Sequence, residues 1–207
     1  RSGANLTDAQ KTRVKAINSE LATLSTQFSQ NVLAEVNDSA IIVSDRAELA
    51  GLSDEQIAGF AESAKEKNMP GKYRIALVNT TIQPILPQLD NRALRERIHK
   101  ASVARGARGN AWDNRAIVSK VTKLRAERAA IMGYPSYAAF SMAEETAKNP
   151  EAVNAMLEKM APPAVANARK EGAVLQAMID SEQKAKGEKT FALEPWDWSY
   201  YTEKVRK

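Results

Sequence analysis

The apolar residues between Thr7 and Asp38 recur every three, four or five positions, and this spacing restricts the chain to helical architectures. A helix turns once in about 3.6 residues, so such spacing puts the side chains on one face. Thr7 and Gln10 form the reciprocal capping pair that satisfies free amides at a helix start. We predict one long packing helix whose stripe faces a core, with the apolar series Val14, Ile17, Leu21, Leu24, Phe28, Leu33 and Val36.

Strand-like sequence is confined to two short runs. Ser39–Ser44 and Tyr73–Val78 are apolar and β-branched, which favours strands. We expect residues 40–44 to pair with residues 73–78, and helices must cover this hairpin because two strands alone are marginally stable. The predicted fold class is therefore all-α, a multi-helix array with one small two-stranded antiparallel β-hairpin.

Caps and helix breakers set the other expected bounds, with a capping pair at Ser53 and Gln56, an N-terminal cap at Ser136 and a left-handed C-cap at Gly133. Further helices are expected over residues 53–67, 91–105, 114–132, 136–142, 150–186 and 196–207, with a helical turn at 46–50 closed by Gly51. Proline lacks an amide donor and clashes with the preceding turn. We therefore expect Pro84 and Pro87 to exclude regular structure before the 91–105 helix. For the same reason Pro162-Pro163 should break or sharply kink its helix near Ala161.

A chain of 207 residues makes one domain or two small ones, here with possible sub-lobes 1–110 and 111–207. It begins without methionine and stops inside a helical pattern, which indicates a piece of something longer. No run approaches the roughly 18 apolar residues of a membrane span. Cysteine is absent, which excludes disulfides and thiolate metal sites. We expect a cytoplasmic protein without membrane contact.

The formal net charge of +5 is unevenly distributed. Between Asn91 and Arg128 eleven Lys and Arg residues stand against three acidic ones, a local charge of +8 that leaves −3 for the rest. Such a block could bind nucleic acid. It could equally be the solvated face of helices, which is the commoner case.

The sequence contains no recognisable set of catalytic residues. His99 is the one histidine, so neither a two-histidine metal motif nor a histidine-based triad can form. Glu144-Glu145 is a carboxylate pair without an evident opposing base. The C-terminal aromatic residues could stack on bases, but core packing with polar tips explains them more simply. They are Trp196, Trp198, Tyr200 and Tyr201.

Three stretches together resemble the zinc oligopeptidases of the thimet oligopeptidase family. They are DRAELAGLSDEQI (45–57), NTTIQPIL (79–86) with DNRALRERIHKASVARG (90–106), and EPWDWSYYTEKVRK (194–207). The linking sequence 112–153 follows that family's order of elements. Within the family, NTTIQP and PWDWSYY resemble the bacterial peptidyl-dipeptidase branch, also called dipeptidyl carboxypeptidases.

This resemblance implies an enzyme that releases dipeptides from the free C-terminus of short peptides. In the family a His-Glu-x-x-His helix and a further glutamate hold zinc, and the intervening glutamate activates the metal-bound water. With one histidine this chain lacks that motif, which the resemblance places beyond Lys207. We expect no catalytic residue, no metal ligand and no cofactor in this chain, with zinc in the longer parent. The fragment is expected to be an inactive helical scaffold lining a channel.

Its expected partners are the catalytic part of the same polypeptide and, in the parent, short peptide substrates. Arg95, Arg97 and Arg105 are electrostatic candidates for attracting the negative terminus of a peptide. The alternatives are a basic helical nucleic-acid-binding module, which would bind with steep salt dependence, and a protein-interaction module. A missing lobe would leave apolar surface uncovered, so dimerisation of the fragment is a further expectation.

Overall fold

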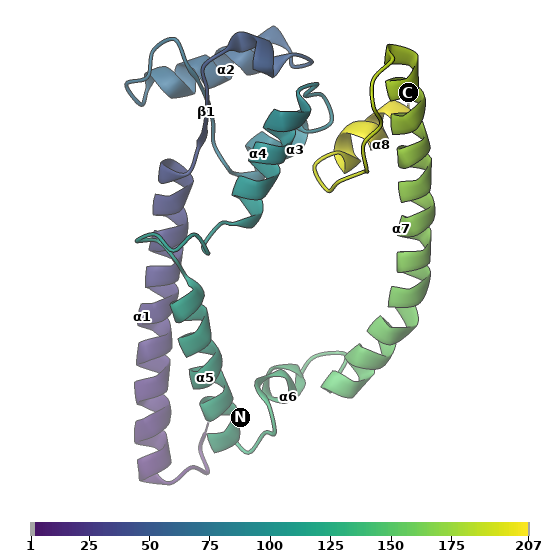
Figure 1. The fold of residues 1–207 in the computed structure, drawn as a ribbon. Helices are drawn as coiled ribbons and strands as arrows, with labels where there is room; N and C mark the ends of the chain where they lie inside the picture. Colours follow the sequence, from purple (N-terminus) through teal and green to yellow (C-terminus); the bar gives the residue numbers. More distant parts are fainter. Residues whose placement is uncertain (1–2, 207) are drawn as a thin grey trace. The chain divides into compact units, whose positions relative to one another are not determined.

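The computed structural model describes residues 3–206 and confirms the predicted all-α class with one small hairpin. Its elements are α1 (Asp8–Asp38), β1 (Ile41–Val43), a 3-10 turn (Arg46–Leu49), α2 (Asp54–Lys65), β2 (Tyr73–Ile75), α3 (Asn79–Ile85), α4 (Arg92–Val103), α5 (Arg115–Ile131), α6 (Tyr137–Met142), α7 (Pro150–Lys186) and α8 (Trp198–Arg206) (Figure 1). Among the described residues, no helix is both long and apolar enough to cross a membrane.

Two compact units can be distinguished, and α1 and α7 contribute to both. The first unit comprises the chain up to Leu33 together with Gly106–Val165. The second comprises Ala34–Arg105 and the chain from Ala166 onward. Each unit therefore contains residues from both sides of position 110. The sub-lobes 1–110 and 111–207 expected from the sequence stay a prediction.

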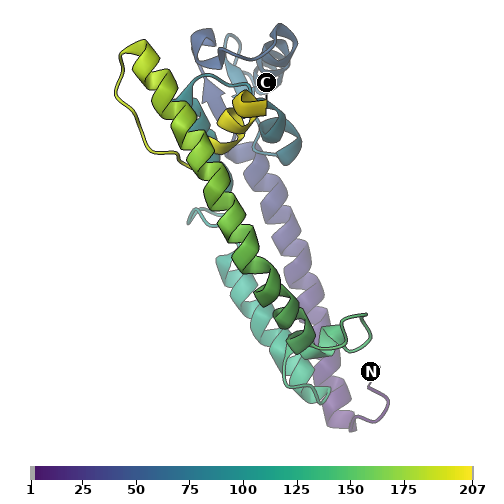
Figure 2. The same ribbon diagram turned by 90° about the vertical axis from the view of Figure 1, so that its right-hand side faces the viewer.

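In the first unit, α1 and α5 lie side by side and antiparallel (Figures 1 and 2). The pairs that join them run in opposite directions along the two helices, because Arg13 bonds Glu127 and Lys120 bonds Glu20. Apolar side chains fill the seam between the helices. The buried ones are Ile17, Leu24, Ile117 and Leu124, flanked by Leu21, Val121 and Ile131. The predicted long packing helix is thereby confirmed.

The inward stripe expected along the whole of this helix is wrong toward its C-terminal end. Phe28 is 39% exposed and Leu33 68% exposed. The physical reason is where α5 begins. Its first residue is Arg115, and the residue before it, Asn114, accepts a hydrogen bond from Asn31 of α1. Leu33 lies past that level, and Phe28 lines an open hollow of about 310 Å³ beside the seam.

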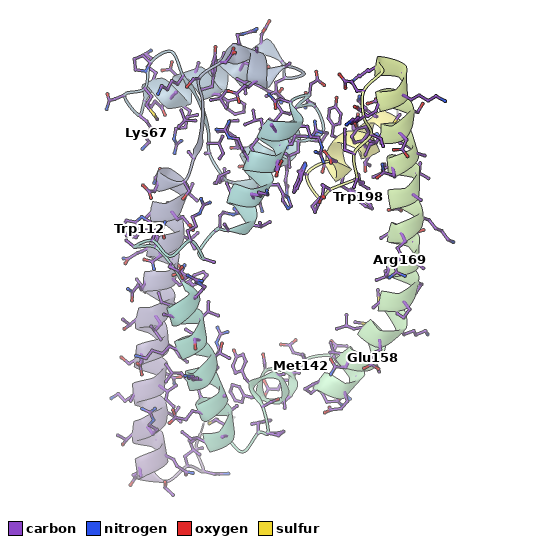
Figure 3. The ribbon with its side chains drawn as sticks, in the orientation of Figure 1. Lys67, Trp112, Met142, Glu158, Arg169 and Trp198 are labelled. Atoms are coloured by element: carbon purple, nitrogen blue, oxygen red, sulfur yellow. The ribbon has the colours of Figure 1, made fainter. Side chains whose placement is uncertain are left out.

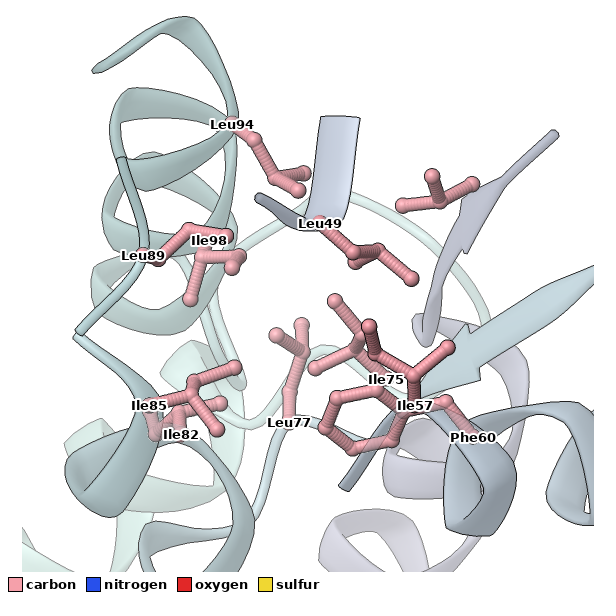
Figure 4. Close-up of a cluster of buried hydrophobic side chains, with 11 residues drawn as sticks. Leu49, Ile57, Phe60, Ile75, Leu77, Ile82, Ile85, Leu89, Leu94 and Ile98 are labelled. Carbon is pink, nitrogen blue, oxygen red and sulfur yellow. The ribbon is translucent and has the colours of Figure 1, made fainter. Parts of the chain in front are cut away.

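The second unit is built around the hairpin. β1 and β2 pair antiparallel with Ile41 opposite Ile75 and Val43 opposite Tyr73, which confirms the predicted pairing over a shorter length. Leu77 leaves the ladder to enter the core, and Val78 is already the N-cap of α3. Apolar side chains from the strands, α2, α3 and α4 form one buried cluster (Figure 4). Its members are Val43, Leu49, Ile57, Phe60, Ile75, Leu77, Ile82, Ile85, Leu89, Leu94 and Ile98.

Gly51 closes the 3-10 turn as predicted, and its backbone requires glycine. Its φ of +91° is in the left-handed region that other residues avoid. An added Cβ would lie 2.0 Å from the carbonyl oxygen of Gln88. Two residues further on, Ser53 and Gln56 form the predicted capping box of α2. The turn and the cap together fix the entry of the chain into α2.

The prediction that Pro84 excludes regular structure was wrong, and so was the break predicted at Pro162-Pro163, while the alternative of a sharp kink there stays a prediction. Residues 79–85 form α3 with Pro84 inside it, because Ile82 and Ile85 are buried in the core and their packing outweighs one lost amide. At the second site α7 continues through Pro162 and Pro163 without the break expected near Ala161. Proline's fixed φ of about −65° is itself helical. On an exposed helix, the carbonyls that lose their donors can bond water instead.

At the C-terminus α8 packs on the second half of α7 (Figure 2). Their shared cluster contains Leu175, Ile179, Tyr200 and Tyr201, which confirms core packing for the two tyrosines. The helix begins at Trp198, two residues later than predicted. Asp197 occupies a turn before it, with its amide donating to the carbonyl of Glu194 at 2.9 Å.

Candidate functional site at Asp197

The second unit contains a buried ionic cluster, the Asp197 centre, formed by Asp197 with Arg92, Arg95, Asp90 and Tyr200. Its arginines lie one turn apart on α4 and face the turn that precedes α8. The start of α4 is fixed by Asn91, whose side chain accepts from the amide of Leu94 at 3.0 Å. This cap fixes the first residue of α4 and therefore the positions of Arg92 and Arg95 on it.

Asp197 is completely buried and accepts hydrogen bonds from two arginines and one backbone amide. Arg92 donates through Nη2 to Oδ2 at 2.8 Å and through Nε to Oδ1 at 3.0 Å. Arg95 donates through Nη2 to Oδ1 at 3.0 Å. The amide of Glu194 donates to Oδ2 at 3.2 Å. Every carboxylate oxygen thus has at least two donors.

Arg95 is 1% exposed, and its guanidinium is surrounded by acceptors. Nη1 donates to the carbonyls of Leu89 at 2.8 Å and Asp90 at 3.0 Å, and Nε donates to the carbonyl of Trp196 at 3.2 Å. The ring of Tyr200 lies 4.1 Å from the guanidinium carbon, a cation–π contact. These partners come from the segment before α4 and from the α8 region. One side chain therefore joins two distant stretches of sequence.

The two guanidinium groups face the buried carboxylate of Asp197, and carbonyl oxygens and the Tyr200 ring also face Arg95. Arginine does not lose its proton in proteins, and both oxygens of the Asp197 carboxylate are already engaged by donors. The Asp197 centre is thus suited to holding segments in register rather than to moving protons.

Tyrosine hydroxyls extend the cluster. Tyr200 donates to Asp90 at 2.7 Å, and burial, together with this hydrogen bond, raises the pKa of its phenol. Burial, aided by the nearby Glu182 carboxylate, raises the pKa of Tyr201 to about 12. Both phenols therefore stay protonated at neutral pH, and Tyr200 acts as a hydrogen-bond donor.

The three arginines proposed from charge all bond to protein groups of the second unit. Arg95 belongs to the Asp197 centre. Arg97 donates to Glu48 at 3.2 Å and to the carbonyl of Ile42 at 3.1 Å. Arg105 donates to the carbonyl of Leu77 at 3.0 Å and to Asn79 at 3.3 Å. Arg97 and Arg105 are exposed, whereas Arg95 is enclosed.

Most cations of the basic block are likewise matched by local partners. Arg115 pairs with Asp113 at 2.7 Å and Lys100 with Glu96 at 2.5 Å, while Lys120 pairs with Glu20. These three cations are therefore already paired with carboxylates of the same chain.

The remaining candidates do not form a metal site or an acid–base site. The ring of His99 lies 6.0 Å from that of Trp196, so this histidine packs against an aromatic side chain. Glu144 and Glu145 are exposed. Within residues 3–206, no group of three or more His, Cys, Asp or Glu side chains is placed to hold a metal ion. The residues described here therefore do not fit the zinc ion that the family resemblance implies.

The sequence alone did not single out Asp197. Two signals could have found it: an acidic residue between tryptophans in PWDW, and Arg92 and Arg95 spaced to share one helix face. Notably, the Asp197 centre joins two of the stretches that carry the family resemblance, residues 90–106 and 194–207.

Comparison with known proteins agrees with that resemblance. The sequence model of peptidase family M3 matches residues 85–207, more than half of the chain. The chain belongs to peptidase family M3. The two segments that form the Asp197 centre, the start of α4 and the turn before α8, both lie within the residues that the M3 model matches.

Several curated relatives match nearly the whole chain. It is 40% identical over 205 residues to a dipeptidyl carboxypeptidase of Escherichia coli (strain K12), covering 99% of this chain and 29% of the relative. The dipeptidyl carboxypeptidase of Salmonella typhimurium (strain LT2) gives the same figures. An oligopeptidase A of Haemophilus influenzae is 33% identical over 213 residues, covering 100% of this chain and 30% of the relative. The chain thus spans less than a third of the length of these curated relatives.

Proposed function

We propose that this chain is the helical, non-catalytic part of a peptidyl-dipeptidase, an enzyme that releases dipeptides from the C-terminus of short peptides. The observation that carries the proposal is the 40% identity over 99% of the chain to a dipeptidyl carboxypeptidase. Identity to the oligopeptidases A is lower, at 33% and 32%. This difference favours the peptidyl-dipeptidase branch that NTTIQP and PWDWSYY indicate.

The chemistry is assigned to the part of the longer polypeptide outside these 207 residues. Zinc there would polarise the peptide carbonyl and supply an activated water. Because the side chains described here do not fit a metal site, this chain is expected to be inactive alone. Its contribution is structural: it supplies wall and support to a channel that admits short peptides.

The Asp197 centre supports this scaffold role. A buried ion pair specifies one arrangement of the groups around it, because a shifted register would leave charges without partners. In this chain it joins the start of α4 to the turn before α8. We propose that it holds these M3 segments in register in the complete enzyme.

A substrate role for the basic residues remains a proposal. Arg97 and Arg105 are the better candidates, since both are exposed and Arg95 is enclosed. Their charge would attract the free carboxylate of a peptide over a distance set by ionic screening. The expected partners are the remainder of the same polypeptide and short peptides, in the cytoplasm. We also retain as a proposal that residues 1–110 and 111–207 are separate sub-lobes.

The test is an assay of the longer polypeptide on matched peptides with a free or an amidated C-terminus, with products identified by mass spectrometry. We expect C-terminal dipeptides from the free peptide and little product from the amidated one. Cleavage at internal bonds that ignores amidation would instead favour an oligopeptidase of the same family. Absence of any cleavage by the zinc-loaded protein would refute the proposal.

A further inference from the structure

The two halves of α7 differ in their environment. All of its buried residues lie in the second half, namely Leu175, Ile179 and Gln183. From Glu151 to Val165 the side chains are exposed, apart from Val153, which is half-buried. Figure 3 labels Glu158 on this first half, where the side chains extend from the ribbon. Almost all side chains on about four turns of this helix are therefore exposed to solvent.

This exposed half is nevertheless amphipathic. At about 100° per residue, one set of apolar residues falls within an arc of about 120°, which we call the α7 stripe. The α7 stripe consists of Val153, Met156, Leu157, Met160 and Ala164. Met156 is 54%, Leu157 52% and Met160 58% exposed. A helix of this pattern ordinarily faces a protein core, so the α7 stripe is an unpartnered packing surface.

The prolines independently indicate which face meets water. Pro162 and Pro163 have no amide hydrogen, so the carbonyls of Glu158 and Lys159 lose their usual donors one turn earlier. Glu158 lies on the side of the helix opposite the α7 stripe, whereas Lys159 lies on the other side of Pro162, toward the edge of the stripe. Such carbonyls are satisfied only where water or a donor reaches them. Water on that face leaves the α7 stripe as the face available to a protein partner.

We propose that the α7 stripe docks into an apolar groove on the part of the longer polypeptide that lies outside these 207 residues. This inference rests on the proposed function. The 205 matched residues are 29% of the Escherichia coli relative, so more than two thirds of such a protein lies outside the match and can supply the groove. A groove on the same polypeptide also has a far higher effective concentration than a second copy.

The binding mode would be a helix in a groove, with Met156, Leu157 and Met160 as anchors at positions i, i+1 and i+4. Methionine side chains are flexible and adapt to irregular apolar surfaces. The partner surface should therefore be aliphatic or aromatic, with polar groups at its edges facing Asn154 and Lys159.

Hydrogen–deuterium exchange tests this directly when the longer polypeptide is compared with the 207-residue chain. We expect the amides of residues 153–161 to exchange at least about tenfold more slowly in the longer polypeptide. Met160→Lys should remove that protection in the longer polypeptide. Ala155→Lys, which places the same charge on the opposite face, should leave it intact. Equal exchange rates in the longer and shorter proteins would overturn the proposal.

A second copy is distinguished from this occupant by sedimentation of the longer polypeptide. A concentration-dependent dimer of the longer polypeptide that Met160→Lys abolishes and Ala155→Lys preserves would assign the α7 stripe to self-association and overturn the proposal. A monomer at all concentrations supports it. Dipeptide release by the longer polypeptide with rapid exchange at 153–161 would refute the docking but not the proposed function. Protection without dipeptide release would do the reverse.

Discussion

Removing the carboxylate at the Asp197 centre should destabilise the protein strongly. In Asp197→Ala the guanidinium of Arg95, 1% exposed, would keep its charge without an anionic partner. Arg92 is 33% exposed and can be rehydrated, so we assign it a small share of the loss. Removing one partner of a buried ion pair costs about 3–5 kcal/mol. For a chain of this size that corresponds to a fall in Tm of roughly 6–20 °C.

Urea unfolding followed by circular dichroism measures this loss, provided that the slope with urea is unchanged. Arg46→Ala is the matched control, because its pair with Asp54 is also an arginine–aspartate contact but is 60% and 92% exposed. That variant should lose at most about 1 kcal/mol. Replacing both partners, as in Arg95→Met with Asp197→Leu, should recover much of the loss. A cost for Asp197→Ala no larger than that of Arg46→Ala would refute the reasoning.

Three further predictions concern the backbone, pH and substrate binding. Gly51→Ala should cost at least about 1–3 kcal/mol in urea unfolding, because its Cβ would meet Gln88, whereas Gly59→Ala in the exposed middle of α2 should stabilise by about 0.5–1 kcal/mol. The folded pKa of Tyr201 is raised from 10.0 to about 12, so its contribution to stability is full below pH 10 and is lost as the pH rises toward about 12. Urea midpoints across that range should fall less steeply in Tyr201→Phe, and identical slopes would contradict this. In the longer polypeptide, Arg97→Glu and Arg105→Glu should raise KM for free-carboxylate peptides more than for amidated ones, and unchanged kinetics would rule out the electrostatic role.

Local sequence patterns predicted most of the fold. The capping pair of Ser53 and Gln56, the N-cap at Ser136 and the left-handed glycine at Gly133 act over a few residues, so their consequences can be read directly. Predictions failed where distant packing decides. Pro84 is helical because Ile82 and Ile85 bury themselves in the core, and Leu33 is exposed because α5 does not reach its level on α1.

The Asp197 centre was beyond local patterns for the same reason. Arg95 and Asp197 are separated by about a hundred residues, and periodicity carries no information about such a contact. The uneven charge could be seen in the sequence, but the pairing of Lys120 with Glu20 and of Arg92 and Arg95 with Asp197 depends on tertiary structure. The family resemblance, and not periodicity, indicated the peptidase family.

The most direct test of the central claim measures zinc content and dipeptide release side by side for the 207-residue chain and the longer polypeptide, each dialysed against zinc. We predict stoichiometric zinc and C-terminal dipeptide release for the longer polypeptide, with neither for the 207-residue chain. Stoichiometric zinc on the 207-residue chain, or dipeptide release by it alone, would contradict the account.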